Sequence, residues 1–147
     1  MPSSLAYFDT SAIAKRYVDE AGSQAVRELL RHNRLVCSAI TPLELLSAIC
    51  RRRAQGSLRP KVAEAIIESI QADRAYWQLA DVTDATLTLA EQIVQTSRLK
   101  TLDAIHVASA QLARMVSGSP LPFITADGEQ RAAAGELGLQ VIWIAHA

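Results

Sequence analysis

The sequence predicts an α/β domain built on a doubly wound parallel sheet. Short apolar runs alternate with longer segments whose apolar residues recur at helical spacing, which is typical of parallel strands joined by crossover helices. The chain has 147 residues, of which 50% are hydrophobic, and it contains only 6 Gly and 5 Pro. These values indicate one globular domain with a substantial core.

The expected strands are short apolar runs bounded by polar or turn-forming residues. They are residues 5–8, 35–37, 77–82, 123–125 and 141–144. The last two are the clearest, because they contain β-branched and aromatic residues and flank an alanine-rich helical segment.

Helices are expected after these strands, each behind a capping residue, a Gly or a Pro. Their start signals are Thr10 or Ser11, Gly22-Ser23, Thr41-Pro42, Pro60, Thr83, Asp103 and Gly128. The segment from Asp103 to Met115 is apolar nearly all round and is therefore predicted to be a deeply buried helix. Gly138 ends the last helix.

Charge and cysteine content limit the kinds of partner and the cellular compartment that the sequence predicts. Lys+Arg and Asp+Glu both number 15, so any nucleic-acid site must be a local patch. Cys37 and Cys50 lie in apolar surroundings without metal-ligand spacing, as buried thiols of a reducing compartment do. No apolar stretch approaches the ~20 residues of a membrane span, and the N-terminus lacks a signal-peptide pattern. We therefore expect a cytoplasmic protein without a membrane partner.

Four acidic residues lie where an apolar run gives way to a helix start: Asp9, Glu44, Asp103 and Asp127. Because the carboxyl ends of parallel strands open on one edge of the sheet, these side chains should meet there. Gathered carboxylates repel one another unless a cation neutralises them, and oxygen-only ligands select a hard ion such as Mg²⁺ or Mn²⁺. This placement predicts a metal-dependent enzyme.

Most of these acids also have a structural explanation. Glu44 matches the last position of a capping box, Asp103 lies in the first turn of its helix, and Asp127 is placed to cap the next helix. Asp9 lacks such an explanation, because the two hydroxyl residues that follow it already supply a cap. Four carboxylates at four strand-to-helix junctions favour a shared site over four separate caps.

Four segments around these acids have the order and composition of known motifs. They are YFDTSAIAKRY at 7–17, TPLEL at 41–45, LDAIHVA at 102–108 and TAD at 125–127. Together they resemble PIN-domain proteins, especially the VapC-type toxin ribonucleases, and the resemblance extends over essentially the whole chain, residues 1–147.

The resemblance implies a five-stranded parallel sheet of order 3-2-1-4-5 with helices on both faces. It also implies a homodimeric Mg²⁺- or Mn²⁺-dependent endoribonuclease that cuts RNA and is inhibited by a small antitoxin. The catalytic acids of the family carry over onto Asp9, Glu44, Asp103 and Asp127, with Asp9 and Asp103 corresponding to the usual metal ligands. Gly128-Glu129 departs from the basic or polar residue that often follows the fourth acid, so the contribution of Glu129 stays open.

Several neighbouring residues have both a structural and a functional interpretation. Thr10 is interpreted as structural, whereas His106, three residues after Asp103, is either a hydrogen-bonded core residue or a phosphate contact. The basic residues Arg51–Arg53 and Lys15-Arg16 are either solvated charges or contacts for RNA phosphates or an acidic antitoxin segment.

Two other classes of α/β protein also place acids at strand ends. A haloacid dehalogenase-type phosphoryl-transfer enzyme requires a second Asp two residues after its nucleophile, where this chain has Ser11. A phospho-receiver domain requires a Lys at a late strand end, and none follows residues 123–125. A third alternative, a PIN-like module kept for binding a partner or RNA without catalysis, stays open.

Overall fold

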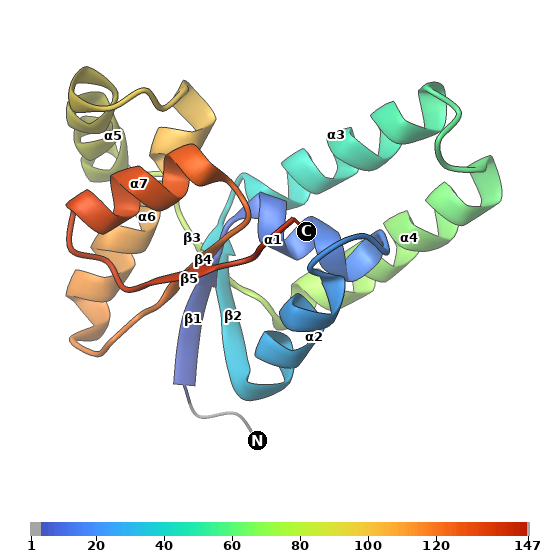
Figure 1. Ribbon diagram of the computed structural model, residues 1–147, viewed down its shortest axis with the longest axis horizontal. Coiled ribbons are helices and arrows are strands. Elements are labelled where there is room, and N and C mark those ends of the chain that lie inside the picture. Colours follow the sequence, from blue (N-terminus) through green and yellow to red (C-terminus); the bar gives the residue numbers. More distant parts are fainter. Residues whose placement is uncertain (1–3, 147) are drawn as a thin grey trace.

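The computed structural model describes residues 4–146, and these residues form a five-stranded parallel sheet between two layers of helices (Figure 1). The strand order is β3-β2-β1-β4-β5 and every neighbouring pair is parallel, so the predicted order 3-2-1-4-5 is confirmed. The strands are β1 (Ser4–Phe8), β2 (Asn33–Ser38), β3 (Gln78–Ala80), β4 (Phe123–Thr125) and β5 (Val141–Trp143).

The helices divide between the two faces of the sheet. They are α1 (Thr10–Tyr17), α2 (Ser23–His32), α3 (Thr41–Ala54), α4 (Pro60–Asp73), α5 (Asp84–Thr96), α6 (Thr101–Ser117) and α7 (Gly128–Glu136), with a 3₁₀ turn η1 (Arg74–Tyr76). Figure 1 shows α5, α6 and α7 on one side of the sheet and α1 to α4 on the other. The predicted helices are therefore all present.

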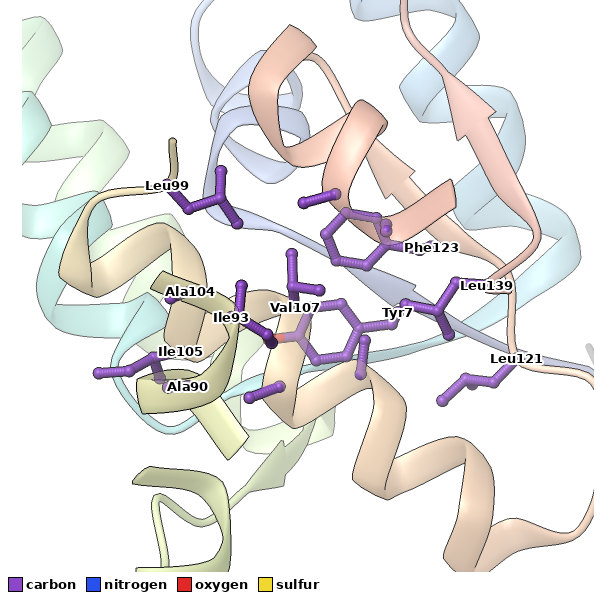
Figure 2. Packing of buried hydrophobic residues seen from close by; sticks show 14 of the residues in the cluster. Tyr7, Ala90, Ile93, Leu99, Ala104, Ile105, Val107, Leu121, Phe123 and Leu139 are labelled. Carbon is purple, nitrogen blue, oxygen red and sulfur yellow. The ribbon is translucent and has the colours of Figure 1, made fainter. Parts of the chain in front are cut away.

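Two hydrophobic clusters hold these layers together, one on each face of the sheet. Successive side chains of β1 alternate between them: Tyr7 joins the cluster under α5, α6 and α7, whereas Ala6 and Phe8 join the cluster under α1 to α4. Figure 2 shows Tyr7 and Phe123 in the first cluster, with Val107 of α6 beside them. The central strand β1 is thus buried on both faces.

Two predicted helix starts were wrong. The cap of α1 is Asp9, whose side chain accepts a hydrogen bond from the Ala12 amide at 3.1 Å. Thr10 therefore lies inside the first turn. Helix α3 is capped by the backbone of Ile40 without a side-chain bond, so Glu44 belongs to no capping box. Asp9 consequently takes the capping role that the sequence pattern assigned to Thr10 or Ser11, whereas Glu44 has no capping role.

The predicted burial of α6 holds only for its first half. Residues 104–110 are buried, but Met115 is 65% and Val116 90% exposed, because the helix continues past the layer that covers it. The apolar residues of α4 also differ in burial, since Ile70 is fully buried in the core and Val62 is 45% exposed. No helix within residues 4–146 combines the length and apolar composition needed for a membrane span.

Candidate active site

A cleft of about 580 Å³ lies at the carboxyl edge of the sheet, where α1, α3, α6 and α7 begin. All four predicted site residues, Asp9, Glu44, Asp103 and Asp127, line it. Parallel β1 and β4 bring Asp9 and Asp127 to the same edge, and the first turns of α3 and α6 bring the other two acids. The structure therefore gathers carboxylates that are spread over most of the chain.

Asp9 is the most deeply buried of the acids, with 1% of its surface exposed. Its oxygens accept hydrogen bonds from the Ser11 hydroxyl at 2.8 and 3.0 Å and from the Ala12 amide. Burial raises the pKa of Asp9 from its ordinary value of 3.8 to about 6, although His106 and these hydrogen bonds act in the opposite direction. A nearby cation would stabilise its charged form.

Ser11 connects the two loops that carry Asp9 and Asp127. Its hydroxyl donates to Asp9 and accepts a hydrogen bond from the Ala126 amide at 3.1 Å. The next amide, that of Asp127, donates to the Thr125 hydroxyl at 2.9 Å. These contacts fix the loop after β4 against the start of α1.

Glu44 is held by two side chains from other elements. Its Oε1 accepts a hydrogen bond from the Thr10 hydroxyl at 2.7 Å and lies 2.6 Å from His106 Nε2. Burial alone raises the pKa of Glu44, but the bonds to His106 and Thr10 outweigh it and leave the pKa below its ordinary value. Thr10, which the sequence favoured as a structural hydroxyl, is thus part of the cleft.

Asp103 and Asp127 are both hydrogen-bonded to Gln130, the first to its side chain and the second to its backbone amide. The Gln130 amide nitrogen donates to Asp103 Oδ1 at 2.8 Å. Burial raises the pKa of Asp103, repulsion from Asp127 and Glu44 adds to this rise, and Gln130 and His106 oppose it. Asp127 caps α7 by accepting from the Glu129 and Gln130 amides, both at 2.9 Å, so its capping role is real.

The four carboxylates of the cleft are suitable ligands for a hard divalent ion, but their oxygens are not arranged around a single point. Among residues 4–146, no group of three or more His, Cys, Asp or Glu side chains is arranged to hold a metal ion. Within the same residues, hydrogen bonds use only one oxygen each of Glu44, Asp103 and Asp127. Each of these carboxylates therefore keeps an oxygen for a ligand, and carboxylate oxygens are what Mg²⁺ and Mn²⁺ prefer.

Gln130 is the residue of the cleft that sequence reasoning missed. It is 2% exposed, and its amide oxygen is buried without a hydrogen-bond partner in the described part of the chain. The available signal was its position three residues after Asp127, which places both on one side of α7. Glutamine side chains are usually exposed, so the residue type alone did not indicate a buried contact.

Of the arginines at the end of α3, only Arg51 lines the cleft. Arg52 turns away and pairs with Glu20 at 3.3 Å, and the guanidinium of Arg53 lies against the Cys50 sulfur. The three adjacent arginines therefore have different environments.

Lys15 and Arg16 do not line the cleft. The Lys15 ammonium is used by Glu20 at 3.2 Å and by the Ala21 carbonyl at 2.8 Å. Arg16 lies 3.5 Å from Asp73. Both basic side chains therefore interact with groups of their own chain outside the cleft.

Comparison with known proteins agrees with this geometry. The sequence model of the PIN domain matches residues 6–136. Ribonuclease VapC46 of Mycobacterium tuberculosis is 33% identical over 138 residues, which are 92% of this chain and 95% of that protein.

Solved structures of low sequence identity share the fold. FitAcB from Neisseria gonorrhoeae superposes with a TM-score of 0.71 at 17% identity, covering 94% of this chain and 96% of the other. A toxin–antitoxin complex from Klebsiella pneumoniae gives 0.66 at 20% identity, covering 93% and 95%. With four acids in one cleft at the carboxyl edge of a 3-2-1-4-5 sheet and a family match over most of its length, the chain belongs to the PIN domain family.

Proposed function

We propose that this protein is a metal-dependent endoribonuclease, the toxin of a toxin–antitoxin pair, and that residues 1–147 act as one PIN domain. The observation that carries the proposal is the cleft, in which four carboxylates from four separate helix starts face a common space. The 33% identity to a ribonuclease over nearly the whole chain supports the same reaction class.

Phosphodiester hydrolysis requires an activated water, an in-line leaving group and neutralisation of charge on the phosphate. A bound Mg²⁺ or Mn²⁺ would neutralise the phosphate and lower the pKa of a water. Asp9 and Asp103 are the proposed ligands, because both line the cleft and burial raises their pKa values, an effect that a bound cation would oppose. Glu44 and Asp127 complete the ligand set or orient the attacking water.

Arg51 is the proposed contact for the RNA backbone. It is exposed, lines the cleft, and has no ion pair among the described residues. A guanidinium binds phosphate oxygens with two parallel hydrogen bonds. A protein without net charge needs such a local positive group to attract RNA. Arg51 would thus give a chain with no net charge a local contact for a polyanion.

The proposed partner is a small antitoxin that covers the same cleft. The similar structure from Klebsiella pneumoniae is a toxin–antitoxin complex. An antitoxin segment that carries Arg or Lys would neutralise the carboxylates in place of the ion. Leu43 and Leu102, which line the cleft and are 71% and 48% exposed, offer apolar contacts on either side. Homodimer formation stays a prediction.

The decisive experiment is cleavage of a panel of structured RNAs by the purified protein after chelation, and again after Mg²⁺ or Mn²⁺ is added back. We expect ion-dependent cleavage that Asp9→Asn abolishes. Asp19→Asn is the matched control, because Asp19 is an exposed acid paired with Arg27 outside the cleft. RNA binding without cleavage at any ion concentration would instead identify a binding module.

A further inference from the structure

A buried pair of side chains joins the core to the cleft, which His106 lines. Tyr7 is fully buried and His106 is 1% exposed. The Tyr7 hydroxyl lies 3.0 Å from His106 Nδ1, and His106 Nε2 lies 2.6 Å from Glu44 Oε1. One imidazole thus contacts the core through one nitrogen and the cleft through the other.

We propose that Tyr7 and His106 form a positioning pair that holds the Glu44 carboxylate in its working orientation. The proposal rests on the proposed function, since it assigns these residues a part in the same site. Neither residue needs to touch the substrate for this role, because both act through Glu44.

The proton donors and acceptors of the network fit one arrangement. A carboxylate only accepts, so Glu44 Oε1 accepts from the Thr10 hydroxyl and from a proton on His106 Nε2. In the neutral imidazole the other nitrogen, Nδ1, is then an acceptor, and the Tyr7 hydroxyl is its donor. The Tyr7 hydroxyl therefore selects the tautomer that can donate to Glu44.

The pair also connects the elements that carry the acids. Tyr7 lies on β1, two residues before Asp9, and His106 lies on α6, one turn after Asp103. Through Nε2, His106 reaches Glu44 on α3. A single side chain on α6 thus contacts both α3 and β1, the strand that leads to Asp9.

The ring of Tyr7 is held independently of its hydroxyl. It stacks on Phe123, with ring centroids 5.5 Å apart and planes at 18°, inside the cluster that Figure 2 shows. Tyr7→Phe should therefore remove the hydrogen bond to His106 and leave the packing unchanged. This makes the hydroxyl separable from the core.

The first test compares Tyr7→Phe with Tyr17→Phe. Tyr17 also loses one hydroxyl bonded to a side chain, at 2.7 Å from Asp73, but it does not line the cleft. With a fluorescent RNA that the wild type cleaves, we expect Tyr7→Phe to lower kcat by about 10-fold with little change in KM. Tyr17→Phe should leave both constants unchanged. Equal kcat in Tyr7→Phe and wild type, at equal thermal stability, would overturn the proposal.

A double-mutant cycle separates positioning from general destabilisation. His106→Gln keeps an amide donor for Glu44 but removes Nδ1, the partner of Tyr7. We expect Tyr7→Phe to change kcat by less than about 2-fold in this background, because the two residues act as a unit. Additive losses in the double variant would contradict a paired role.

Nitrogen-15 spectra of labelled histidine rings test the pair without any RNA. The loss of one signal set in His106→Gln assigns His106 among the three histidines. We expect its Nδ1 signal to shift in Tyr7→Phe and not in Tyr17→Phe, and an unchanged spectrum would overturn the proposal. A shifted spectrum in a protein that cleaves none of the RNAs supports the pair and counts against the ribonuclease function instead.

Discussion

The carboxylates on the two sides of the cleft have pKa values shifted in opposite directions. On the α3 side, Glu44 receives hydrogen bonds from Thr10 and His106, and its pKa lies below its ordinary value. Between β1 and α6, burial holds the pKa values of Asp9 and Asp103 above theirs. Hydrogen bonds therefore favour the charged form of Glu44, whereas burial disfavours the charged forms of Asp9 and Asp103.

This difference suggests a division of labour. An acid whose charge is already satisfied is suited to orient a water or a proton, and acids that lack a counter-charge are suited to bind an ion.

The largest effect is expected from the side that lacks a counter-charge. Asp9→Asn and Asp103→Asn should each lower the rate of RNA cleavage by more than about 100-fold, because an amide keeps the shape but loses the charge that holds the ion. Single-turnover cleavage with excess ion measures the loss, and circular dichroism checks the fold. Near-wild-type cleavage by either variant would remove that residue from the ion site.

The stability of the ion-free protein should depend on pH through Asp9. A folded pKa of about 6, raised from 3.8, means that the folded state binds the proton more tightly than the unfolded chain does. The resulting stabilisation is complete below pH ~4 and is lost as pH rises through about 6. At pH 8, the free energy of unfolding of ion-free Asp9→Asn should therefore exceed that of ion-free wild type by up to ~3 kcal/mol.

Urea unfolding after chelation, at pH 5 and pH 8, measures this difference. Added Mg²⁺ or Mn²⁺ should raise the melting temperature of wild type and barely change that of Asp9→Asn, because ligands stabilise only the state that binds them. A variant less stable than wild type at pH 8, with an unchanged response to ion, would reduce Asp9 to its capping role in α1.

A smaller loss of cleavage rate is expected for Glu44, whose charge the protein's own hydrogen bonds stabilise. Glu44→Gln should lower kcat by roughly 10- to 100-fold while weakening ion affinity less than Asp9→Asn does. Mn²⁺ titration by calorimetry compares the two variants directly. Equal loss of ion binding in both would show that the carboxylates share one role, and the division of labour would fail.

The smallest effect on cleavage is expected for Arg51, the exposed arginine that lines the cleft. Arg51→Ala should raise KM for RNA roughly 5- to 10-fold with kcat unchanged, since one charge-assisted contact is lost in both the bound state and the transition state. Arg53→Ala is the matched control, because Arg53 lies on the same helix end but does not line the cleft. Similar KM values in both variants would mean that the arginines act only through general charge.

Local patterns predicted the four acids of the cleft, and the resemblance to PIN-domain proteins implied the strand order that the structure has. Apolar runs, helix-start residues and motif order are visible along the chain. The direction of a side chain is not, because it depends on elements far away in the sequence. Arg51 and Arg52 are adjacent, yet one lines the cleft and the other pairs with Glu20 on a different segment.

The capping errors have the same origin. A Thr or Ser after a strand is a good cap by propensity, but the Ser11 hydroxyl is used to join Asp9 to the Ala126 amide, so the carboxylate caps α1 instead. Gln130 and the Tyr7–His106 pair were likewise beyond local reasoning, since each contact spans 27 residues or more.

The central place of β1 has a consequence for the timing of activity during synthesis. Asp9 is made early, but β1 gains its second neighbour, β4, only when residues 123–125 exist, and Asp127 follows them. A nascent chain that ends before β4 carries three of the acids on an unfinished sheet and has neither the loop that Ser11 anchors nor Gln130. The cleft of this chain therefore stays incomplete during synthesis until β4 and the loop that follows it have been made.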